Sequence, residues 1–313
     1  MLNYAMNKEE ELKNKVIPQT KREDFEAFWI SSVEQMRQKP IEIKRSVLKT
    51  PYEKTFITYE ISYNTHDDTW IDAYFSVPVG AKEKLPCVAW FHGGGGRREI
   101  HAEILATGVC CFAMDVREQG GSSPDKAVYE RAGSNGGVMT RGVLNKDEFY
   151  MRNIYLDAVR AMDVIAQLPE VDPERIVTCG GSQGGALSIV ASALSGHSKK
   201  CYSYITSYCC LKQRTEKGSG IFASTSRFLK DHPQHSDIVF ETLSYFDIIN
   251  MVSMLKVPVS FAMGLADPIC LPQFVYSAYA HTPGEKTIDM YPFVEHKLPI
   301  PYKNKKLEEF SKL

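Results

Sequence analysis

A glycine-rich run around one serine is the part of the sequence best suited to chemistry. The run covers residues 180–185 and contains the pattern G-x-S-x-G at Ser182. An apolar segment typical of a buried strand precedes it, and an apolar, small-residue segment typical of a helix follows it. A serine on such a strand-to-helix turn has a strained backbone and faces the free N–H groups of the helix start, where a negative oxygen develops during acyl transfer. The pattern predicts a nucleophilic serine; the alternative is a glycine turn that binds phosphate or only packs closely.

A serine nucleophile needs a histidine to take its proton and an acid to orient that histidine. On a strand-turn-helix elbow, the acid and then the histidine follow the serine along the chain. Asp267 comes just after a predicted strand, and His296 lies in the loop after the last one. His281 also follows the acid, but it ends a predicted helix and is explained by the helix dipole. Taken alone, Asp267 is also a natural turn residue before proline and His296 an ordinary solvated histidine; together with Ser182 they predict a catalytic triad.

The negative oxygen of a tetrahedral intermediate needs two N–H donors. One comes from the residue after the nucleophile, which is Gln183. The other is expected from Gly94 in the run 92–96, because this run ends a predicted buried strand and its glycines let the backbone approach a substrate. We therefore predict an oxyanion hole formed by the backbone N–H groups of Gly94 and Gln183.

The composition is that of an ordinary globular protein. The 313 residues are 43% hydrophobic and 24% charged, and 37 Lys and Arg against 38 Asp and Glu give a net charge of -1. This balance does not recruit nucleic acid or an anionic membrane. The first sixteen residues have no apolar signal-like stretch, and no apolar run reaches membrane-spanning length, so we expect a cytoplasmic protein. The eight cysteines show no C-x-x-C spacing and are expected to be reduced core thiols, with neither a metal site nor a disulfide framework.

The periodicity of apolar residues predicts an α/β fold. Alternating patterns predict antiparallel strands at 41–48, 56–63 and 71–77, while continuous apolar runs predict central parallel strands covered on both faces. The later strands are predicted at 87–91, 109–114, 175–179, 203–205, 257–263 and 287–291. Helices are predicted at 151–168, 186–194, 240–255 and 273–280. Strands that alternate with helices form a doubly wound, mostly parallel sheet.

We predict one domain over residues 1–313. Residues 1–38 are expected to be an amphipathic helical extension that packs outside the sheet. Residues 211 to about 255 are expected to be an insertion over the carboxyl ends of the strands, where α/β sheets bind ligands.

Five segments and two single residues together carry a family resemblance. They are residues 115–121, 155–161, 169–172, 180–185 and 241–247, with Asp267 and His296. They resemble the acetyl xylan esterase and cephalosporin C deacetylase family of carbohydrate esterases, over the chain from about residue 24 to its end. The resemblance implies an α/β-hydrolase fold and removal of acetyl groups from small acylated sugars and related esters without metal or other cofactor. It also implies a homo-oligomer, in this family a ring-like hexamer.

The resemblance also gives roles to single residues. Ser182 would be the nucleophile, His296 the base and then the acid, and Asp267 the residue that orients it. The Arg-Gly-Gln motif of the family, thought to brace the site, falls on Arg117 and Gln119 with Glu118 in place of the glycine.

Several positions depart from the family pattern. Glu118 replaces the motif glycine, and Gly94 stands where the family usually has a tyrosine. Glu295 and Lys297 replace the glycine and the glutamate on either side of the histidine, and the run 208–210, which begins with Tyr208, stands where a proline-aromatic pair lines the pocket. The missing aromatic at Gly94 predicts that acyl groups larger than acetyl are accepted.

Three hypotheses of function follow from the sequence. The first is a serine esterase that deacetylates small carbohydrate esters through an acyl-enzyme. The second is a hydrolase or acyltransferase that acts on another small acyl compound. The third is a catalytically silent member that binds a ligand or partner, motivated by the altered residues beside the motifs.

Overall fold

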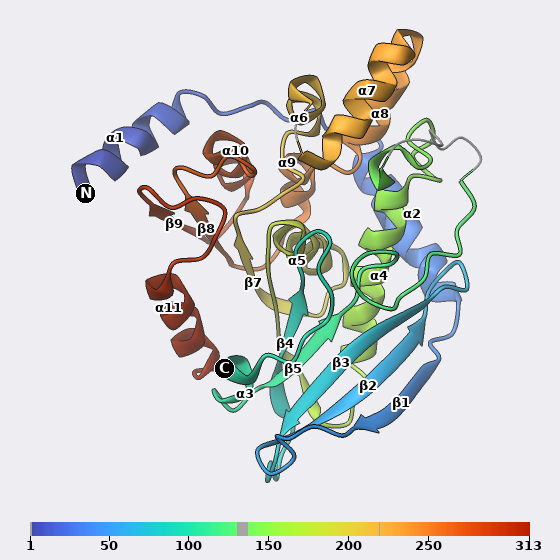
Figure 1. Cartoon of the computed structure of the whole chain (residues 1–313), viewed down its shortest axis with the longest axis vertical. Helices are drawn as coiled ribbons and strands as arrows, with labels where there is room; N and C mark the ends of the chain where they lie inside the picture. The colour runs from blue at the N-terminus through green and yellow to red at the C-terminus, as the bar shows by residue number, and fades with distance from the viewer. Residues whose placement is uncertain (1, 130–136, 219) are drawn as a thin grey trace.

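The protein is built on one nine-stranded sheet (Figure 1). The computed structural model describes residues 2–129, 137–218 and 220–313. The strands are β1 (Ile43–Leu48), β2 (Phe56–Asn64), β3 (Trp70–Pro78), β4 (Leu85–Phe91), β5 (Cys110–Met114), β6 (Val171–Gly181), β7 (Ser198–Tyr204), β8 (Val259–Gly264) and β9 (Lys286–Tyr291). Their order across the sheet is β1-β2-β3-β5-β4-β6-β7-β8-β9.

The pairing of the strands follows the burial pattern predicted for them. β1, β2 and β3 pair antiparallel, and β3 pairs antiparallel with β5. From β5 across the sheet to β9 every pair is parallel. β5 and β8 are buried along their whole length, as expected where helices cover both faces of a parallel sheet. The predicted doubly wound sheet with antiparallel first strands is confirmed.

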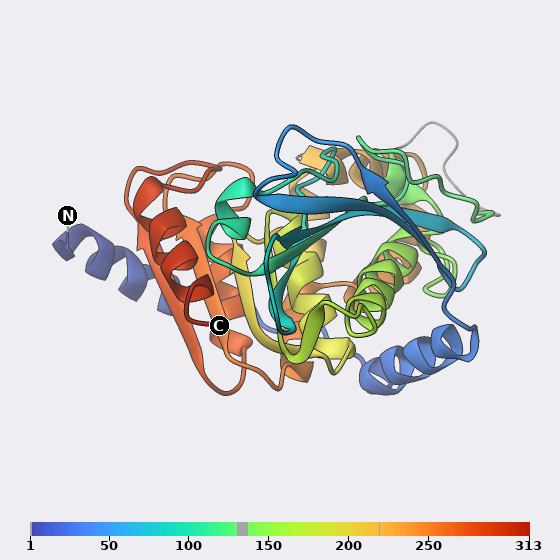
Figure 2. The ribbon, with the colours of Figure 1, turned by 90° about the horizontal axis from the view of Figure 1, so that it is seen from below.

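Helices cover both faces of this sheet (Figure 2). They are α1 (Leu2–Lys13), α2 (Phe25–Gln38), α3 (Ala102–Leu105), α4 (Tyr150–Ile165), α5 (Gln183–Leu194), α6 (Leu211–Lys217), α7 (Ala223–Asp231), α8 (Ser236–Ser244), α9 (Ile248–Met251), α10 (Pro272–His281) and α11 (Ile300–Phe310). Short 3-10 turns lie at Val138–Thr140, Gly220–Phe222, Pro233–His235 and Val252–Met254.

Two hydrophobic clusters fill the space on either side of the sheet. The larger one joins α2, α4 and α5 to the sheet and includes Trp29, Leu187 and Ile176. The smaller one lies under α3 and α11 and includes Phe310 and Val177. Neighbouring residues of β6 thus enter opposite clusters, because successive side chains of a strand point to opposite faces.

The N-terminal segment, predicted as a helical extension over residues 1–38, contains two helices. Residues between α1 and α2 are outside any helix. α2 belongs to the main core, since Phe25 and Trp29 are fully buried. The indole nitrogen of Trp29 donates a hydrogen bond of 2.9 Å to the carbonyl of Tyr245. The segment therefore ties the start of the chain to the 211–255 region.

The 211–255 region is a group of short helices beyond the carboxyl ends of the central strands (Figure 1). The single helix predicted at 240–255 is wrong, because the chain breaks between α8 and α9. Asp247 causes the break: its carboxylate accepts hydrogen bonds from the N–H groups of Ile249, Cys210 and Leu211. It therefore caps α9 and fixes the start of α6 at the same time.

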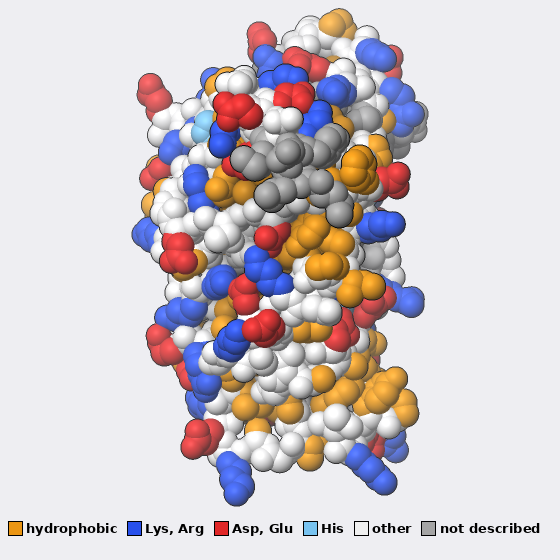
Figure 3. Space-filling view, turned by 90° about the vertical axis from the view of Figure 1, so that its left-hand side faces the viewer, with side chains coloured by type: hydrophobic (Ala, Val, Ile, Leu, Met, Phe, Trp, Pro, Cys, Tyr) orange, Lys and Arg blue, Asp and Glu red, His pale blue; other side chains and the backbone are white. Residues whose placement is uncertain are grey.

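The surface carries charges of both signs. On the face shown in Figure 3, basic and acidic side chains are interspersed with small hydrophobic areas. Among the helices of the described residues, none combines the length and the apolar character that crossing a membrane requires.

Candidate active site

Ser182 lies on the sharp turn between the end of β6 and the start of α5. Its backbone has φ 57 and ψ -121, a left-handed conformation that is strained for a residue with a side chain. Its N–H donates to the carbonyl of Tyr204 at 3.0 Å, and its carbonyl accepts from the N–H groups of Ala186 and Ser207 at 3.2 and 3.0 Å. The strain predicted for this serine is confirmed, and hydrogen bonds on both sides hold the strained turn in place.

The glycines of the turn are required by close packing. A Cβ atom at Gly184 would lie 1.9 Å from the carbonyl oxygen of Phe91, and one at Gly181 would lie 2.0 Å from the ring of Tyr204. The first contact is with backbone and the second with a buried ring, so a side chain at either position displaces the turn. The elbow is therefore pressed against the ends of β4 and β7.

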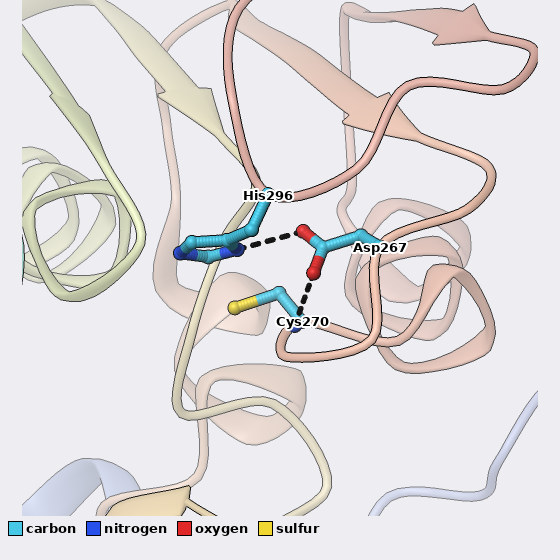
Figure 4. Close-up of side chains that lie close together, drawn as sticks. All are labelled: Asp267, Cys270 and His296. Atoms are coloured by element: carbon cyan, nitrogen blue, oxygen red, sulfur yellow. Dashed lines mark hydrogen bonds and ion pairs between the residues drawn. The ribbon is translucent and has the colours of Figure 1, made fainter.

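Asp267 and His296 meet at the ends of β8 and β9 (Figure 4). One carboxylate oxygen of Asp267 lies 2.8 Å from Nδ1 of His296. The other accepts hydrogen bonds from the backbone N–H groups of Ile269 and Cys270 at 2.8 and 2.9 Å. Asp267 is buried, while the His296 side chain is 22% exposed. The acid is thus fixed in a turn, and the imidazole remains accessible from outside.

The loops that carry these two residues are joined through their backbones. The N–H of Leu265 donates to the carbonyl of Tyr291, and the N–H of Ala266 donates to that of Val294, both at 3.0 Å. A Cβ atom at Gly264 would lie 2.1 Å from the carbonyl oxygen of Val294, so glycine is needed where the loops cross. These contacts set the separation of Asp267 and His296.

The pKa of the His296 imidazole is raised to about 9. The hydrogen bond to Asp267 is the main cause, followed by the side chain of Cys270. An acid beside a histidine stabilises the imidazolium that forms when the ring takes a proton.

Ser182 stands at the same edge of the sheet as this pair. β6, β7, β8 and β9 are neighbours and run parallel, so their carboxyl ends, which carry the three residues, lie along one rim. The structure brings Asp267 and His296 into contact. The contact between the imidazole and the Ser182 hydroxyl stays a prediction.

The loop after β4 lies against the elbow. A Cβ atom at Gly93 would be 3.9 Å from the Cβ of Ser182, and one at Gly94 would be 3.9 Å from Oε1 of Gln183. His92 holds the loop: its Nε2 accepts from the N–H of Val116 at 2.9 Å, so Nδ1 carries the proton and donates to the Gly93 carbonyl at 2.7 Å. Burial lowers the pKa of His92, which favours this neutral form. The predicted oxyanion residues are therefore placed beside Ser182, and their donor role stays a prediction.

Gln119 connects this loop to the residue after the serine. Its Nε2 donates to Oε1 of Gln183 at 2.9 Å, and its Oε1 accepts from Nε2 of Gln183 at 3.0 Å and from the N–H of Gly95 at 2.9 Å. The hydroxyl of Tyr208 adds a bond of 2.6 Å to Oε1 of Gln183. The side-chain amides thus form a closed network under the predicted oxyanion hole.

Arg117 acts deeper in the molecule. It is fully buried and forms two hydrogen bonds of 2.7 Å with the carboxylate of Asp157 on α4. It also donates to Asp67 at 2.6 Å and to Asp125 at 3.1 Å. Burial favours the protonated form of Asp67, but the hydrogen bonds from Arg117 outweigh it and lower the pKa of that carboxyl. Arg117 therefore anchors the chain on which Gln119 stands, without lying at the elbow itself.

Glu118 separates these two residues in a left-handed conformation with φ 51. Its carboxylate pairs with Arg141 and is about half exposed, at 49% of the side chain. The side chain therefore points to solvent and leaves the contacts of Arg117 and Gln119 intact.

Sequence reasoning missed one residue of this region and the contact of another. Cys270 places its thiol next to the imidazole of His296, and Tyr208, expected only at a pocket position, bonds to Gln183 from the loop after β7. No spacing signal marks either of them, because each contact joins segments far apart in the chain. His281 lies elsewhere, with Nε2 2.8 Å from the carbonyl of Ile17.

Comparison with known proteins identifies similar chains. The family model for acetyl xylan esterase matches residues 1–313. An acetyl esterase of Xylanibacter ruminicola is 25% identical over 288 residues, which cover 89% of this chain. The aligned part is 64% of that relative, so the chain spans somewhat under two thirds of its length.

Two solved structures are similar over nearly their whole length. An acetyl xylan esterase from Paenibacillus sp. R4 is 31% identical with a TM-score of 0.90, covering 97% of this chain and 98% of the other. An acetyl xylan esterase from Thermoanaerobacterium sp. JW/SL YS485 is 25% identical with a TM-score of 0.88, covering the same shares. The resemblance stated from the sequence, and with it the α/β-hydrolase fold, is confirmed.

Proposed function

The chain belongs to the acetyl xylan esterase family, and from that premise we propose that it is a serine esterase that removes acetyl groups from small acylated carbohydrates and related esters. Ser182 is the nucleophile, His296 the general base and acid, and Asp267 the residue that orients the imidazole. The observation that carries the proposal is the 2.8 Å hydrogen bond between Asp267 and Nδ1 of His296. It fixes the tautomer in which Nε2 can accept a proton.

The reaction proceeds in two steps. The Ser182 oxygen attacks the acetyl carbonyl carbon while Nε2 of His296 takes the hydroxyl proton, and the imidazolium then gives this proton to the leaving sugar oxygen. Water, deprotonated by the same imidazole, next attacks the acetyl-serine, and the imidazolium returns the proton to the Ser182 oxygen as acetate leaves. Asp267 stays ionised throughout and stabilises the imidazolium.

The negative oxygen of each tetrahedral intermediate is bound by the backbone N–H groups of Gly94 and Gln183. The N–H of Gln183 belongs to the first turn of α5, where helix N–H groups have no partner within the helix. Gln119 positions both donors through its bonds to Gly95 and to the Gln183 side chain. Each such donor lowers the activation free energy by about 2.7 to 4 kcal/mol.

The acyl pocket accepts groups larger than acetyl. Glycine at position 94 leaves space, since a Cβ atom there would approach only Oε1 of Gln183, at 3.9 Å. Propionyl and butyryl esters are therefore substrates alongside acetylated xylo-oligosaccharides and cephalosporin C.

The proposal extends to compartment and assembly. The eight cysteines are free and buried, which suits a reducing compartment such as the cytoplasm.

We also expect the chain to form a homo-oligomer, a hexamer as is the tendency in this family. Light scattering coupled to size-exclusion chromatography measures the number of chains in the assembly. The domain proposal, one unit over residues 1–313, is tested by a single cooperative unfolding transition.

Labelling with a fluorophosphonate, followed by peptide mass spectrometry, tests the catalytic assignment directly. The label is expected on Ser182, because only a serine with a working base reacts quickly. Ser182→Ala should lower kcat by about a millionfold on p-nitrophenyl acetate, whereas Ser31→Ala, at an exposed serine of α2, should leave it unchanged. A protein that folds but neither takes the label nor hydrolyses acetate esters would instead be a silent member of the family.

A further inference from the structure

We propose that Asp267, Cys270 and His296 form a binding site for a zinc-like divalent ion, and that an ion bound there reversibly inhibits the esterase. Each residue offers one ligand atom, a carboxylate oxygen, a sulfur and a ring nitrogen, and these atoms lie within 4.8 Å of one another. Figure 4 shows the sulfur of Cys270 and the carboxylate of Asp267 both close to the imidazole of His296. Ion binding can be measured without any esterase activity, whereas inhibition rests on the proposed function.

The separations suit zinc after small shifts of the ligand atoms. Zinc binds sulfur at about 2.3 Å and nitrogen or oxygen at about 2.0–2.2 Å, so ligand atoms of a tetrahedral site stand roughly 3.3–3.6 Å apart. The oxygen and nitrogen of Asp267 and His296 are already 2.8 Å apart and need only separate by about half an ångström. Two hydrogen bonds from the backbone hold Asp267 in place while this happens.

The ligand types select the ion. Thiolate and imidazole favour zinc and softer ions, whereas magnesium and calcium prefer oxygen ligands only. The thiolate and the carboxylate together carry two negative charges, which balance the charge of the ion. Binding releases the thiol proton of Cys270 to solvent. If Nδ1 is the ligand, the proton that it shares with Asp267 moves to Nε2, so the ring stays neutral.

The ion reaches the site from the imidazole side. Cys270 and Asp267 are buried, so the partly exposed ring of His296 marks the entry. An ion held by His296 removes the base from the reaction, whichever ring nitrogen binds it. At Nε2 it occupies the proton acceptor, and at Nδ1 it replaces the bond that orients the ring.

The binding test uses Ser182→Ala, which keeps all three ligands and does not depend on activity. Zinc affinity is measured by competition with a chromogenic chelator, and cadmium serves as a spectroscopic probe through the ultraviolet band of a thiolate-cadmium bond. We expect one ion per chain with that band. Cys270→Ala should abolish the band and weaken zinc affinity at least about 100-fold. Cys87→Ala, which removes an equally buried thiol from β4, should change neither.

Cys270→Ser provides a second variant of nearly the same shape, for which the same losses are expected. If both Cys270 variants keep the cadmium band and the zinc affinity, the proposed site is wrong. It is also wrong if the Ser182→Ala protein, which has all its cysteines, shows no cadmium band.

Esterase assays separate this proposal from the proposed function. Zinc, but not magnesium, should inhibit the wild-type enzyme, and a chelator should restore its rate. An active enzyme that binds no zinc refutes only the metal site. A zinc-binding protein without esterase activity refutes only the proposed function.

Discussion

Replacing Gln119 with methionine tests whether the amide network holds the predicted oxyanion hole. Gln119 forms four side-chain hydrogen bonds: two with Gln183, one with the N–H of Gly95 and one of 3.3 Å with the hydroxyl of Tyr150. Methionine has nearly the same length and volume but can form none of them. The substitution therefore removes the network without creating a cavity.

The magnitude follows from what each partner can do afterwards. Gly95 is exposed and can bond to water, and the Tyr150 hydroxyl still donates to the Arg117 carbonyl at 2.7 Å. The two bonds to buried Gln183 are the net loss, at about 1 kcal/mol each. The free energy of unfolding should fall by about 2 kcal/mol. If the loop loses its position to the same extent, kcat/KM falls about 30-fold.

Both quantities are measured on the same protein sample, by urea unfolding and by p-nitrophenyl acetate hydrolysis. Gln35→Met is the matched control, since Gln35 is exposed on α2 and bonds only to Ser31 in the described structure. Its free energy of unfolding should stay within about 0.5 kcal/mol of wild type and its kcat/KM should not change.

A double-mutant cycle with Gln183→Met makes the test strict. Either single substitution breaks the same amide pair, so the two losses should not add, and a coupling energy of about 1–2 kcal/mol is expected. Additive losses in kcat/KM would refute the network as the positioning device. So would a Gln119→Met enzyme that loses stability but keeps full activity.

Substitutions at three further positions test other features of the structure. Glu118→Gly removes the strain of a left-handed residue, but it also loses the ion pair with Arg141 and gives the unfolded chain more conformational freedom. These effects oppose each other, so the free energy of unfolding, measured in urea, should stay within about 0.5 kcal/mol of wild type. Glu118→Val places a β-branched side chain in the same conformation and should lower the free energy of unfolding by about 1 kcal/mol or more. Burial lowers the pKa of His66 from 6.5 to about 4, so the folded state favours the neutral ring. Between pH 6.5 and pH 4 only the unfolded state takes up the proton, so the free energy of unfolding is highest above pH 6.5 and falls as the pH drops toward 4. His66→Gln keeps a donor for Asn153 and does not titrate. Across that pH window the free energy of unfolding of wild type, measured in urea, should fall by up to about 3 kcal/mol more than that of the variant. Equal pH dependence of the two proteins would contradict the assignment. Gly94→Tyr should lower the ratio of butyrate to acetate hydrolysis about tenfold or more, and an unchanged ratio would show that the pocket is bounded elsewhere.

The sheet could be predicted from the sequence because its strands show their burial. Continuous apolar runs identified the central strands, and alternating runs identified β2 and β3. β7 shows the limit: only residues 203–205 were predicted, whereas the strand runs from Ser198 to Tyr204. Its first half contains Lys199 and Lys200, which resemble loop residues but extend to ion pairs with Glu174 and Glu309. Parallel pairing with β6, which the local sequence does not show, makes these residues part of the strand.

The two interpretations of Asp267 from the sequence turn out not to exclude each other. The sequence allowed either a turn residue or a catalytic acid. In the structure one oxygen bonds to the N–H groups of Ile269 and Cys270, as in a turn, and the other bonds to His296. The turn is what aims the second oxygen, so both interpretations describe the same residue.

The contacts between side chains of the site were beyond the sequence. Gln119 and Gln183 are 64 positions apart, and nothing in either segment indicates that their amides pair. The same holds for Cys270 and His296, whose approach depends on the crossing of two loops at Gly264. Chain order predicts which residue types reach one rim of the sheet, but side-chain pairing needs the three-dimensional path of each loop.

Glu118 explains how the contacts of Arg117 and Gln119 form without a glycine between them. Arg117 turns inward to the buried carboxylates and Gln119 turns toward the loop at Gly95, so the chain between them must reverse direction. A left-handed residue provides that reversal, and glycine adopts the conformation at least cost. Glutamate adopts it here with φ 51, and its exposed side chain pairs with Arg141. These contacts of Arg117 and Gln119 depend on the backbone turn, which Glu118 makes.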